Sequence, residues 1–295
     1  MIAPMVTTAP ASDTALTPRP ARNHIVDVLI AERAPGLTRS WAWPVIRPPL
    51  YALLDYGKAR RMADAIANLS GADGLLYGSA LLALKTTVEH LERIPKTGRC
   101  LIVSNHPTGI ADGIAMYDAL NRVRRDGVFF ANADALRVCA RFSEVIIPVE
   151  WVESKRTREK TRATLAAAKA AFEGERAVVM FPAGRLARRT QEGLTDPPWA
   201  HTACSLARKY HAPVIPVHMD GPWSTLFHLF DRFSQELRDV TLFHELLNKH
   251  GKAFHLIVGQ PIPPDELDID AAVATEKLKH YVERVLPTNP DAPFA

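Results

Sequence analysis

The chain has 295 residues, of which 47% are hydrophobic, so it is long enough to enclose one large core and a small accessory region. Its 36 Lys and Arg residues against 32 Asp and Glu residues give a net charge of +4, which is compatible with an anionic surface as partner but does not demonstrate one. Three distant cysteines without CxxC or Cys/His spacing argue against a disulfide framework and a zinc site: Cys100, Cys139 and Cys204. A reducing cytoplasm is the expected environment of such a chain.

The first 72 residues are predicted to lie outside the main core. Residues 1–22 combine several prolines with Ala and Thr and contain no continuous apolar stretch, which predicts a disordered tail. Residues 23–72 are predicted to form an amphipathic helical region that faces a membrane. Within it, residues 41–56 carry Trp41 and Trp43 beside an arginine, a mixture that suits a bilayer interface. Packing of the same aromatic side chains on the core explains this segment equally well.

No part of the sequence is apolar enough to predict a helix that spans a bilayer. Such a helix needs about 18 uninterrupted apolar residues. The two longest candidates, residues 75–84 and 94–103, are interrupted by Gly and Ser or by Lys and Arg. Any contact with a membrane is therefore expected to be peripheral.

From residue 73 onward, helical patterns alternate with short apolar runs. A helix is predicted over residues 73–93, because apolar residues recur there at helical spacing and Asp73 can cap its start. Further helices are predicted over residues 110–123, 155–173, 200–210 and 226–237, with a last one ending at Val285. The apolar runs predict strands over residues 99–107, 128–133, 144–150, 177–184, 213–221 and 253–263. This alternation predicts an α/β fold with a largely parallel central sheet flanked by helices, in one domain over residues 73–295.

A histidine and an aspartate stand where the first of these predicted strands ends. His106 follows the strand, and Asp112 comes six positions later at the start of a helix. A histidine can take a proton from a hydroxyl if a carboxylate fixes its tautomer and stabilises the imidazolium. The pair would then act as a catalytic triad without its serine, with the substrate as nucleophile. A loop histidine beside a helix-capping aspartate is the alternative, and a metal site is disfavoured because no third His or Cys lies nearby.

A second polar motif follows the strand predicted over residues 177–184. It places Gly184 and the arginines Arg185, Arg188 and Arg189 within a short stretch. Because guanidinium groups bind phosphate oxygens in a two-pronged fashion, this stretch predicts contact with an anionic part of a substrate. An exposed basic turn is the alternative. The carboxyl ends of parallel strands meet at one edge of a sheet, so both motifs are expected to lie together.

Taken together, these motifs resemble those of the glycerolipid acyltransferase superfamily. Its members share an Asn-His-x-x-x-x-Asp block, a Phe-Pro-Glu-Gly-Thr-Arg block and a Val-Pro-Val-type block, and their order and strand context agree with residues 75–220 here. The resemblance implies that His106 and Asp112 are catalytic. It implies that Asn105, Gly184, Arg185 and Arg188 bind substrate. The matching segments are Asn105-His106 to Asp112, Phe181-Pro182-Ala183-Gly184-Arg185 and Val214-Ile215-Pro216-Val217.

The chain departs from this family pattern in three ways. Five residues instead of four separate His106 from Asp112, so a one-residue bulge at Thr108–Gly109 is needed to bring the carboxylate to the imidazole. In the second block, Ala183 replaces the usual glutamate and Arg185 comes one place early, and the arginine that the family carries after its middle strand is missing. These changes resemble the bacterial hemolysin-like and ornithine- or glycine-lipid acyltransferase branch.

The resemblance implies an O-acyltransferase that moves a fatty acyl group from acyl-CoA or acyl carrier protein to a lysolipid-type acceptor. That acceptor would be a lysophospholipid or an acylated amino acid, with His106 as general base supported by Asp112. No cofactor and no metal would be needed beyond the acyl donor. The expected location is the cytoplasm, peripherally on the inner face of the cell membrane, with membrane lipids as partners.

Two further expectations concern partners and an alternative function. Basic residues after residue 154 would suit an acidic carrier protein or an anionic lipid, although a solvated helix face explains them as well. No nucleic acid partner is expected, because the basic residues are not interleaved with exposed aromatic residues. A lipid-binding or trafficking protein that keeps the fold without catalysis is the alternative function.

Overall fold

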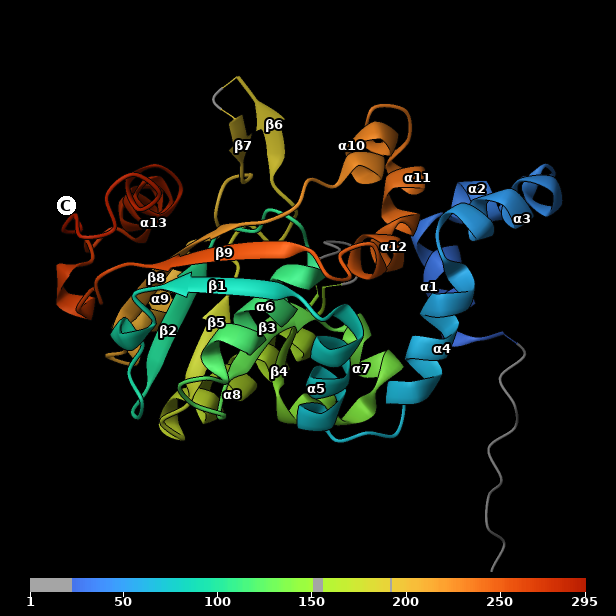
Figure 1. Ribbon diagram of the computed structural model, residues 1–295. Coiled ribbons are helices and arrows are strands. Elements are labelled where there is room, and N and C mark those ends of the chain that lie inside the picture. Colours follow the sequence, from blue (N-terminus) through green and yellow to red (C-terminus); the bar gives the residue numbers. More distant parts are fainter. Residues whose placement is uncertain (1–22, 151–155, 192) are drawn as a thin grey trace, which may run out of the picture.

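The structure is a computed structural model that describes residues 23–150, 156–191 and 193–295 (Figure 1). The tail predicted over residues 1–22 lies outside the described residues. A seven-stranded sheet with the order β1-β9-β8-β2-β5-β3-β4 forms the centre of the described chain. Its strands are β1 (Lys85–Glu89), β2 (Cys100–Ser104), β3 (Val128–Asn132), β4 (Ile146–Val149), β5 (Ala177–Met180), β8 (Val214–Asp220) and β9 (Ala253–Val258).

The sheet is largely parallel, as predicted. Strands β8, β2, β5, β3 and β4 run parallel to one another. Strand β9 runs antiparallel to β8, and β1 pairs parallel to β9. Every residue of β2 is buried, which is typical of a central strand covered on both faces. The α/β fold class is confirmed.

Helices cover both faces of the sheet (Figure 1). Side chains of α8, α9 and α13 pack on one face and side chains of α5, α6 and α12 on the other. Leu101 and Val103 of β2 face the first layer and Ile102 faces the second, because successive side chains of a strand point to opposite faces. These helices are α5 (Gly71–Leu82), α6 (Ile110–Leu120), α8 (Arg158–Glu173), α9 (Thr202–Lys209), α12 (Leu242–Leu247) and α13 (Ala271–His280), which a π-helical turn over Tyr281–Val285 continues.

The N-terminal region forms a helical group at one edge of the molecule (Figure 1). Leu50, Leu54 and Ala59 pack there with Val240, so this group has its own small hydrophobic core shared with the segment before β9. Residues 23–72 are thus helical, while the domain boundary at residue 73 stays a prediction. The elements are α1 (Ile25–Arg33), α2 (Pro35–Arg39), α3 (Trp43–Leu53) and α4 (Tyr56–Ile66), packed near α10 (Thr225–Asp231) and α11 (Gln235–Val240).

The helix predicted over residues 73–93 is wrong in its second half. Helix α5 ends at Leu82, and Ala83 adopts a left-handed conformation with φ of 42°. The next residues are rich in β-branched side chains and pair with β9 as strand β1, so tertiary pairing overrides the helical spacing. Ser70, not Asp73, caps the helix, because its hydroxyl accepts the backbone N–H of Asp73.

The structure contains a hairpin that the sequence does not predict, and one predicted helix is divided in two. A two-stranded antiparallel hairpin of β6 (Arg188–Thr190) and β7 (Gly193–Thr195) follows β5. The helix predicted over residues 226–237 is divided between α10 and α11. Among the described residues, no helix combines the length and the apolar character needed to cross a membrane. The remaining short elements are α7 (Asp134–Val138) and 3-10 turns over Leu91–Arg93, Ala140–Glu144 and Pro264–Glu266.

Candidate active site

The predicted approach of His106 and Asp112 is observed. Nδ1 of His106 lies 2.9 Å from Oδ2 of Asp112. At this ring orientation Nδ1 is buried and forms no aligned hydrogen bond, so the pair is a close approach of imidazole and carboxylate. Asp112 is fully buried, whereas 16% of the His106 side chain is exposed. The carboxylate therefore lies behind the imidazole, which remains accessible from solvent.

A turn through Gly109 accommodates the extra residue between His106 and Asp112. Gly109 has φ of 94°, and an added Cβ would lie 3.1 Å from a methyl group of Leu186, so only glycine fits without strain. The backbone N–H groups of Thr108 and Gly109 donate to Oδ2 of Asp112 at 2.9 and 3.0 Å. The Thr108 hydroxyl donates to Oδ1. The bulge predicted at Thr108–Gly109 thus brings the carboxylate to the imidazole.

The imidazole of His106 is held from one side by an aromatic ring. It stacks on Phe181, with ring centroids 4.7 Å apart and an angle of 28° between the planes. Phe181 directly follows β5, the parallel neighbour of β2, and the backbone N–H of Ala187 donates to the His106 carbonyl at 2.9 Å. The two polar motifs therefore meet at the carboxyl edge of the sheet, as the parallel arrangement predicted.

Asn105 connects the active-site loop to strand β8. Its Nδ2 donates to the Met219 carbonyl at 2.8 Å, and its Oδ1 accepts the Met219 backbone N–H at 2.7 Å. Both ends of the amide are thus bonded to backbone, and the residue is buried. These bonds hold the carboxyl end of β2 beside β8. Substrate binding by Asn105 stays a prediction.

The second motif forms a turn and then a hairpin. Gly184 has φ of 61°, and its N–H donates to the Phe181 carbonyl at 3.0 Å, which closes the turn after β5. Arg185 is exposed and makes no ion pair with any residue that the structure describes. Arg188 forms an ion pair of 2.5 Å with Asp231 at the end of α10. Arg185 is the better placed of the two for an anionic ligand; both assignments stay predictions.

Sequence reasoning missed Asp196, a second carboxylate at the site. It is 5% exposed and follows the hairpin, and both of its oxygens lie 3.1 Å from the backbone nitrogen of His106. Burial raises the pKa of Asp196 to about 7, against the opposing effect of His106. A single aspartate in a polar loop has neither periodicity nor motif spacing, so only the fold reveals it.

The structure also bears on metal ions. Within residues 23–150, 156–191 and 193–295, no group of three or more His, Cys, Asp or Glu side chains is arranged to hold a metal ion. All three cysteines are buried and free. The sequence predicts no disulfide framework. The expectation that the reaction needs no metal or cofactor stays a prediction.

Comparison with known proteins gives two curated relatives of similar length. The chain is 28% identical over 207 residues to the lyso-glycine lipid O-acyltransferase of Phocaeicola vulgatus, covering 68% of this chain and 72% of the relative. It is 27% identical over 204 residues to the lyso-glycine lipid O-acyltransferase of Bacteroides thetaiotaomicron, covering 67% and 73%. A crystal structure of the 1-acyl-sn-glycerophosphate (LPA) acyltransferase PlsC from Thermotoga maritima aligns with a TM-score of 0.45 and 14% identity, over 90% of this chain and 95% of that one.

A family model supports the same enzyme class independently. The model described as Acyltransferase matches residues 78–286, which is more than half of the chain and includes both polar motifs. The class predicted from the motifs, an O-acyltransferase related to the lysophospholipid acyltransferases, is confirmed. The chain belongs to the Acyltransferase family.

Proposed function

We propose that this enzyme transfers a fatty acyl group from an acyl thioester to the hydroxyl of a lysolipid-type acceptor, with His106 as general base. The observation that carries the proposal is the 2.9 Å approach of His106 to the buried Asp112 at the carboxyl edge of the sheet. The exposed Arg185, in the turn after β5, would hold the anionic part of the acceptor or the donor.

The imidazole would first accept one proton from the acceptor hydroxyl and then donate it to the leaving thiolate. With Nδ1 facing Asp112, Nε2 is left to accept the proton of the acceptor hydroxyl while its oxygen attacks the thioester carbonyl carbon. The resulting imidazolium is stabilised by the Asp112 carboxylate. Collapse of the tetrahedral intermediate breaks the C–S bond, and the imidazolium donates its proton to the leaving thiolate. An ester and a free thiol are the products, and His106 ends neutral as it began.

The acceptor is proposed from the curated relatives. Both are named lyso-glycine lipid O-acyltransferases, so a lyso-glycine lipid is the first acceptor to try, with lysophosphatidic acid as the phosphate-bearing competitor. The donor would be acyl-CoA or acyl carrier protein. Comparison of kcat/KM for the two acceptors, each with both donors, tests this assignment. Equal or higher kcat/KM for lysophosphatidic acid would overturn the choice of acceptor.

Arg185 is proposed to bind the anionic group of the acceptor or the donor. Replacing it with Ala is expected to raise the apparent KM about tenfold with a smaller change in kcat, since one charge-assisted hydrogen bond is lost from ground and transition states alike. Lys should restore the KM only in part, because it offers a point charge in place of a planar fork. Steady-state kinetics with each substrate varied in turn would measure both constants.

The matched control for Arg185 is Arg125→Ala. Arg125 is also exposed, but it precedes β3 and therefore lies at the amino end of the strands, away from His106. Its removal should leave both constants unchanged. A normal KM in the Arg185→Ala variant would remove Arg185 from the binding site.

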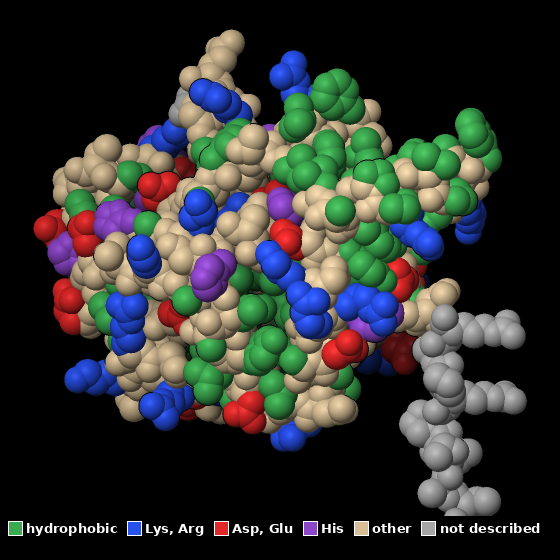
Figure 2. Space-filling model, turned by 45° about the vertical axis from the view of Figure 1, so that its right-hand side comes forward, with side chains coloured by type: hydrophobic (Ala, Val, Ile, Leu, Met, Phe, Trp, Pro, Cys, Tyr) green, Lys and Arg blue, Asp and Glu red, His purple; other side chains and the backbone are tan. Residues whose placement is uncertain are grey.

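The enzyme is further proposed to work in the cytoplasm, bound peripherally to the inner face of the cell membrane. Figure 2 shows hydrophobic side chains gathered over α3 and the adjoining α10–α11 segment. We call this the apolar surface; its most exposed members, with exposed fractions of 45 to 92%, are Trp41, Val45, Leu53, Leu229 and Phe233. Trp43 and Phe230 are partly buried against the N-terminal core, so Trp41 and Phe233 are the side chains proposed to insert into the membrane.

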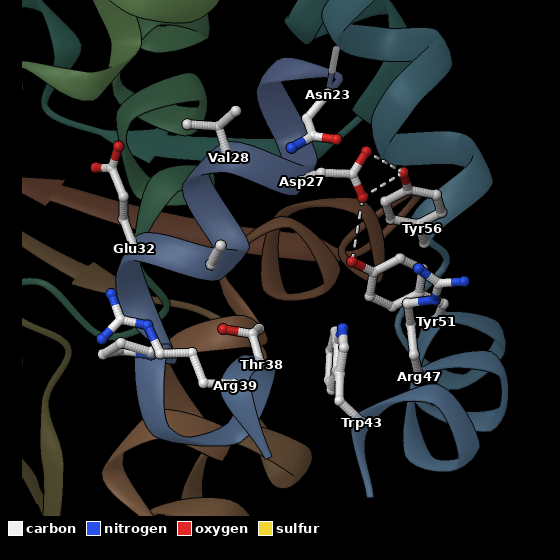
Figure 3. Close-up of a pocket in the computed structure, with 12 residues that line it drawn as sticks. Asn23, Asp27, Val28, Glu32, Thr38, Arg39, Trp43, Arg47, Tyr51 and Tyr56 are labelled. Carbon is white, nitrogen blue, oxygen red and sulfur yellow. Dashed lines mark hydrogen bonds between the residues drawn. The ribbon is translucent and has the colours of Figure 1, made fainter. Parts of the chain in front are cut away.

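A cleft beside the apolar surface supplies positive charge. The cleft holds about 930 Å³ between α1 and α3, and Arg39 and Arg47 line it without an ion pair to any described residue (Figure 3). In its wall, the Tyr56 hydroxyl lies 2.7 Å from both oxygens of Asp27, and the Tyr51 hydroxyl donates to one of them at 3.2 Å. These arginines would attract anionic headgroups, at about 1 kcal/mol each near a membrane surface.

A double substitution tests the apolar surface. Trp41→Ser with Phe233→Ser is expected to weaken binding to vesicles that contain anionic lipid, because each large side chain contributes about 1 to 3 kcal/mol when buried in the interface. Binding of the wild type should also decrease with salt without vanishing. Vesicle flotation would measure both effects.

The control for this substitution is Ile269→Ser. Ile269 is 86% exposed but precedes α13, on the opposite side of the sheet from the N-terminal helices (Figure 1). The Ile269→Ser variant should float with the vesicles to the same extent as the wild type. Equal flotation of the double variant and the wild type, or flotation of neither, would contradict the proposed membrane surface.

A further inference from the structure

We propose that Asp196 is a positioning residue for the reaction at His106: its ionised carboxylate holds the His106 backbone and favours the imidazolium that forms during acyl transfer. This inference rests on the proposed function of the same site. Neither the sequence motifs nor the family match assigns any role to Asp196. Its contacts, its burial and its charged neighbours each support the role.

The contacts of Asp196 converge on His106. Both carboxylate oxygens lie 3.1 Å from the His106 backbone nitrogen, and Oδ2 also accepts the Nε1–H of Trp199 at 2.9 Å. Trp199 is 2% exposed and belongs to the main core, so it anchors the carboxylate to a rigid wall. His106 is thereby held between two buried carboxylates, Asp112 at its ring and Asp196 at its backbone. A fixed backbone keeps the imidazole against Asp112 and Phe181.

The charged groups around Asp196 come from three elements. On the C-terminal helix, Glu283 accepts the Asp196 backbone N–H at 2.7 Å and pairs with Lys279 at 3.0 Å, and Arg284 donates to the Thr195 hydroxyl at 2.7 Å. The active-site loop contributes His106, which acts on Asp196 directly, and β8 contributes His218, which interacts with Glu283. The Glu283 charge opposes ionisation of Asp196, whereas a charged His106 favours it. By the same coupling, an ionised Asp196 favours the imidazolium form of His106.

The raised pKa of Asp196 has a defined effect on stability. Burial, the largest cause, raises that pKa from about 4 in an unfolded chain to about 7. The unfolded chain therefore loses its proton first, so this group lowers folding stability progressively as the pH rises from 4 to 7, and the loss is complete above 7. A buried aspartate that costs stability at neutral pH is explained more readily by a role in the reaction than by a role in folding.

Asp196→Asn separates these two roles. At pH 8 the variant is expected to lose at least tenfold in kcat with a KM close to that of the wild type, because the negative charge beneath His106 is gone. Its kcat should also fall less steeply than that of the wild type as the pH drops through 7. The difference in melting temperature, variant minus wild type, should increase from pH 5 to pH 8. The reason is that only the wild type carries a buried charge at the higher pH. A buried aspartate without a role in the reaction would show the same melting-temperature trend, but neither the kcat loss nor the altered pH profile of kcat.

Glu283→Gln provides a second, milder variant. Glutamine still offers an oxygen to the Asp196 backbone N–H, but it removes the negative charge that raises the pKa of Asp196. The pH at which kcat falls to half of its maximum should therefore move lower. This test remains decisive if Asp196→Asn does not fold.

Two results would overturn the inference. One is an Asp196→Asn variant with the kcat and pH profile of the wild type; the other is a Glu283→Gln profile that superimposes on that of the wild type. If the wild type itself transfers no acyl group, the proposed function fails and this inference fails with it. An active wild type with an unaffected Asp196→Asn variant refutes the inference alone.

Discussion

Replacing His106 with Ala is expected to lower kcat for acyl transfer by about 10³-fold, within the range that general acid and base catalysis contributes. His106 is the group on the accessible side of the pair, and no other described imidazole lies against Asp112. Without it, the acceptor hydroxyl has no base and the leaving thiolate no acid. A continuous assay of thiol release would measure the loss, with circular dichroism to show that the variant folds.

His201→Ala is the matched control for this loss. His201 is exposed and precedes α9, and among the described residues no ion pair joins it to Asp112. It should retain the kcat of the wild type. A folded His106→Ala variant that keeps more than a tenth of the wild-type kcat would show that another group removes the proton.

Replacing Asp112 with Asn is expected to lower kcat by about 10²-fold or more while the protein stays folded. Asp112 accepts three hydrogen bonds from Thr108 and Gly109 and lies against Nδ1 of His106. Asn has nearly the same shape, but it lacks the charge that stabilises the imidazolium. Its amide group would also donate where the site needs an acceptor, which favours the wrong tautomer. Single-turnover kinetics would separate this loss from any change in substrate binding.

The control is Asp118→Asn, the same chemical change six residues further along α6. Burial raises the pKa of Asp118, and the residue makes no contact with His106, so removing its charge should leave kcat unaltered. Near-normal kcat in a folded Asp112→Asn variant would reject the proposed pairing of His106 and Asp112.

The sequence was sufficient to place the two main motifs. His106 and the arginine motif each follow a short apolar run, and such runs become buried strands whose carboxyl ends meet at one edge. The extra residue before Asp112 could be located because Gly109 is the position at which a positive φ carries no steric cost. Patterns of this kind allow a correct prediction because they depend on local backbone geometry.

The features that the sequence did not predict depend on distant contacts. The sequence predicts the end of a helix at β1, because the strand character of β1 comes from pairing with β9, more than 160 residues later. Asp196 lies 90 residues from His106 and is brought to it by the hairpin and by Trp199. Whether an aromatic residue such as Trp41 or Trp43 faces solvent or core likewise depends on which helices pack nearby.

The most direct test of acyl transfer at this site is mass spectrometry of the lipid product. The purified enzyme, with vesicles, would be given an isotopically labelled acyl thioester and an excess of lyso-glycine lipid. We expect a two-chain lipid whose mass has increased by one labelled acyl group, with one free thiol released for each molecule formed. Labelled free fatty acid without the two-chain lipid, or product formed equally well by His106→Ala, would contradict it.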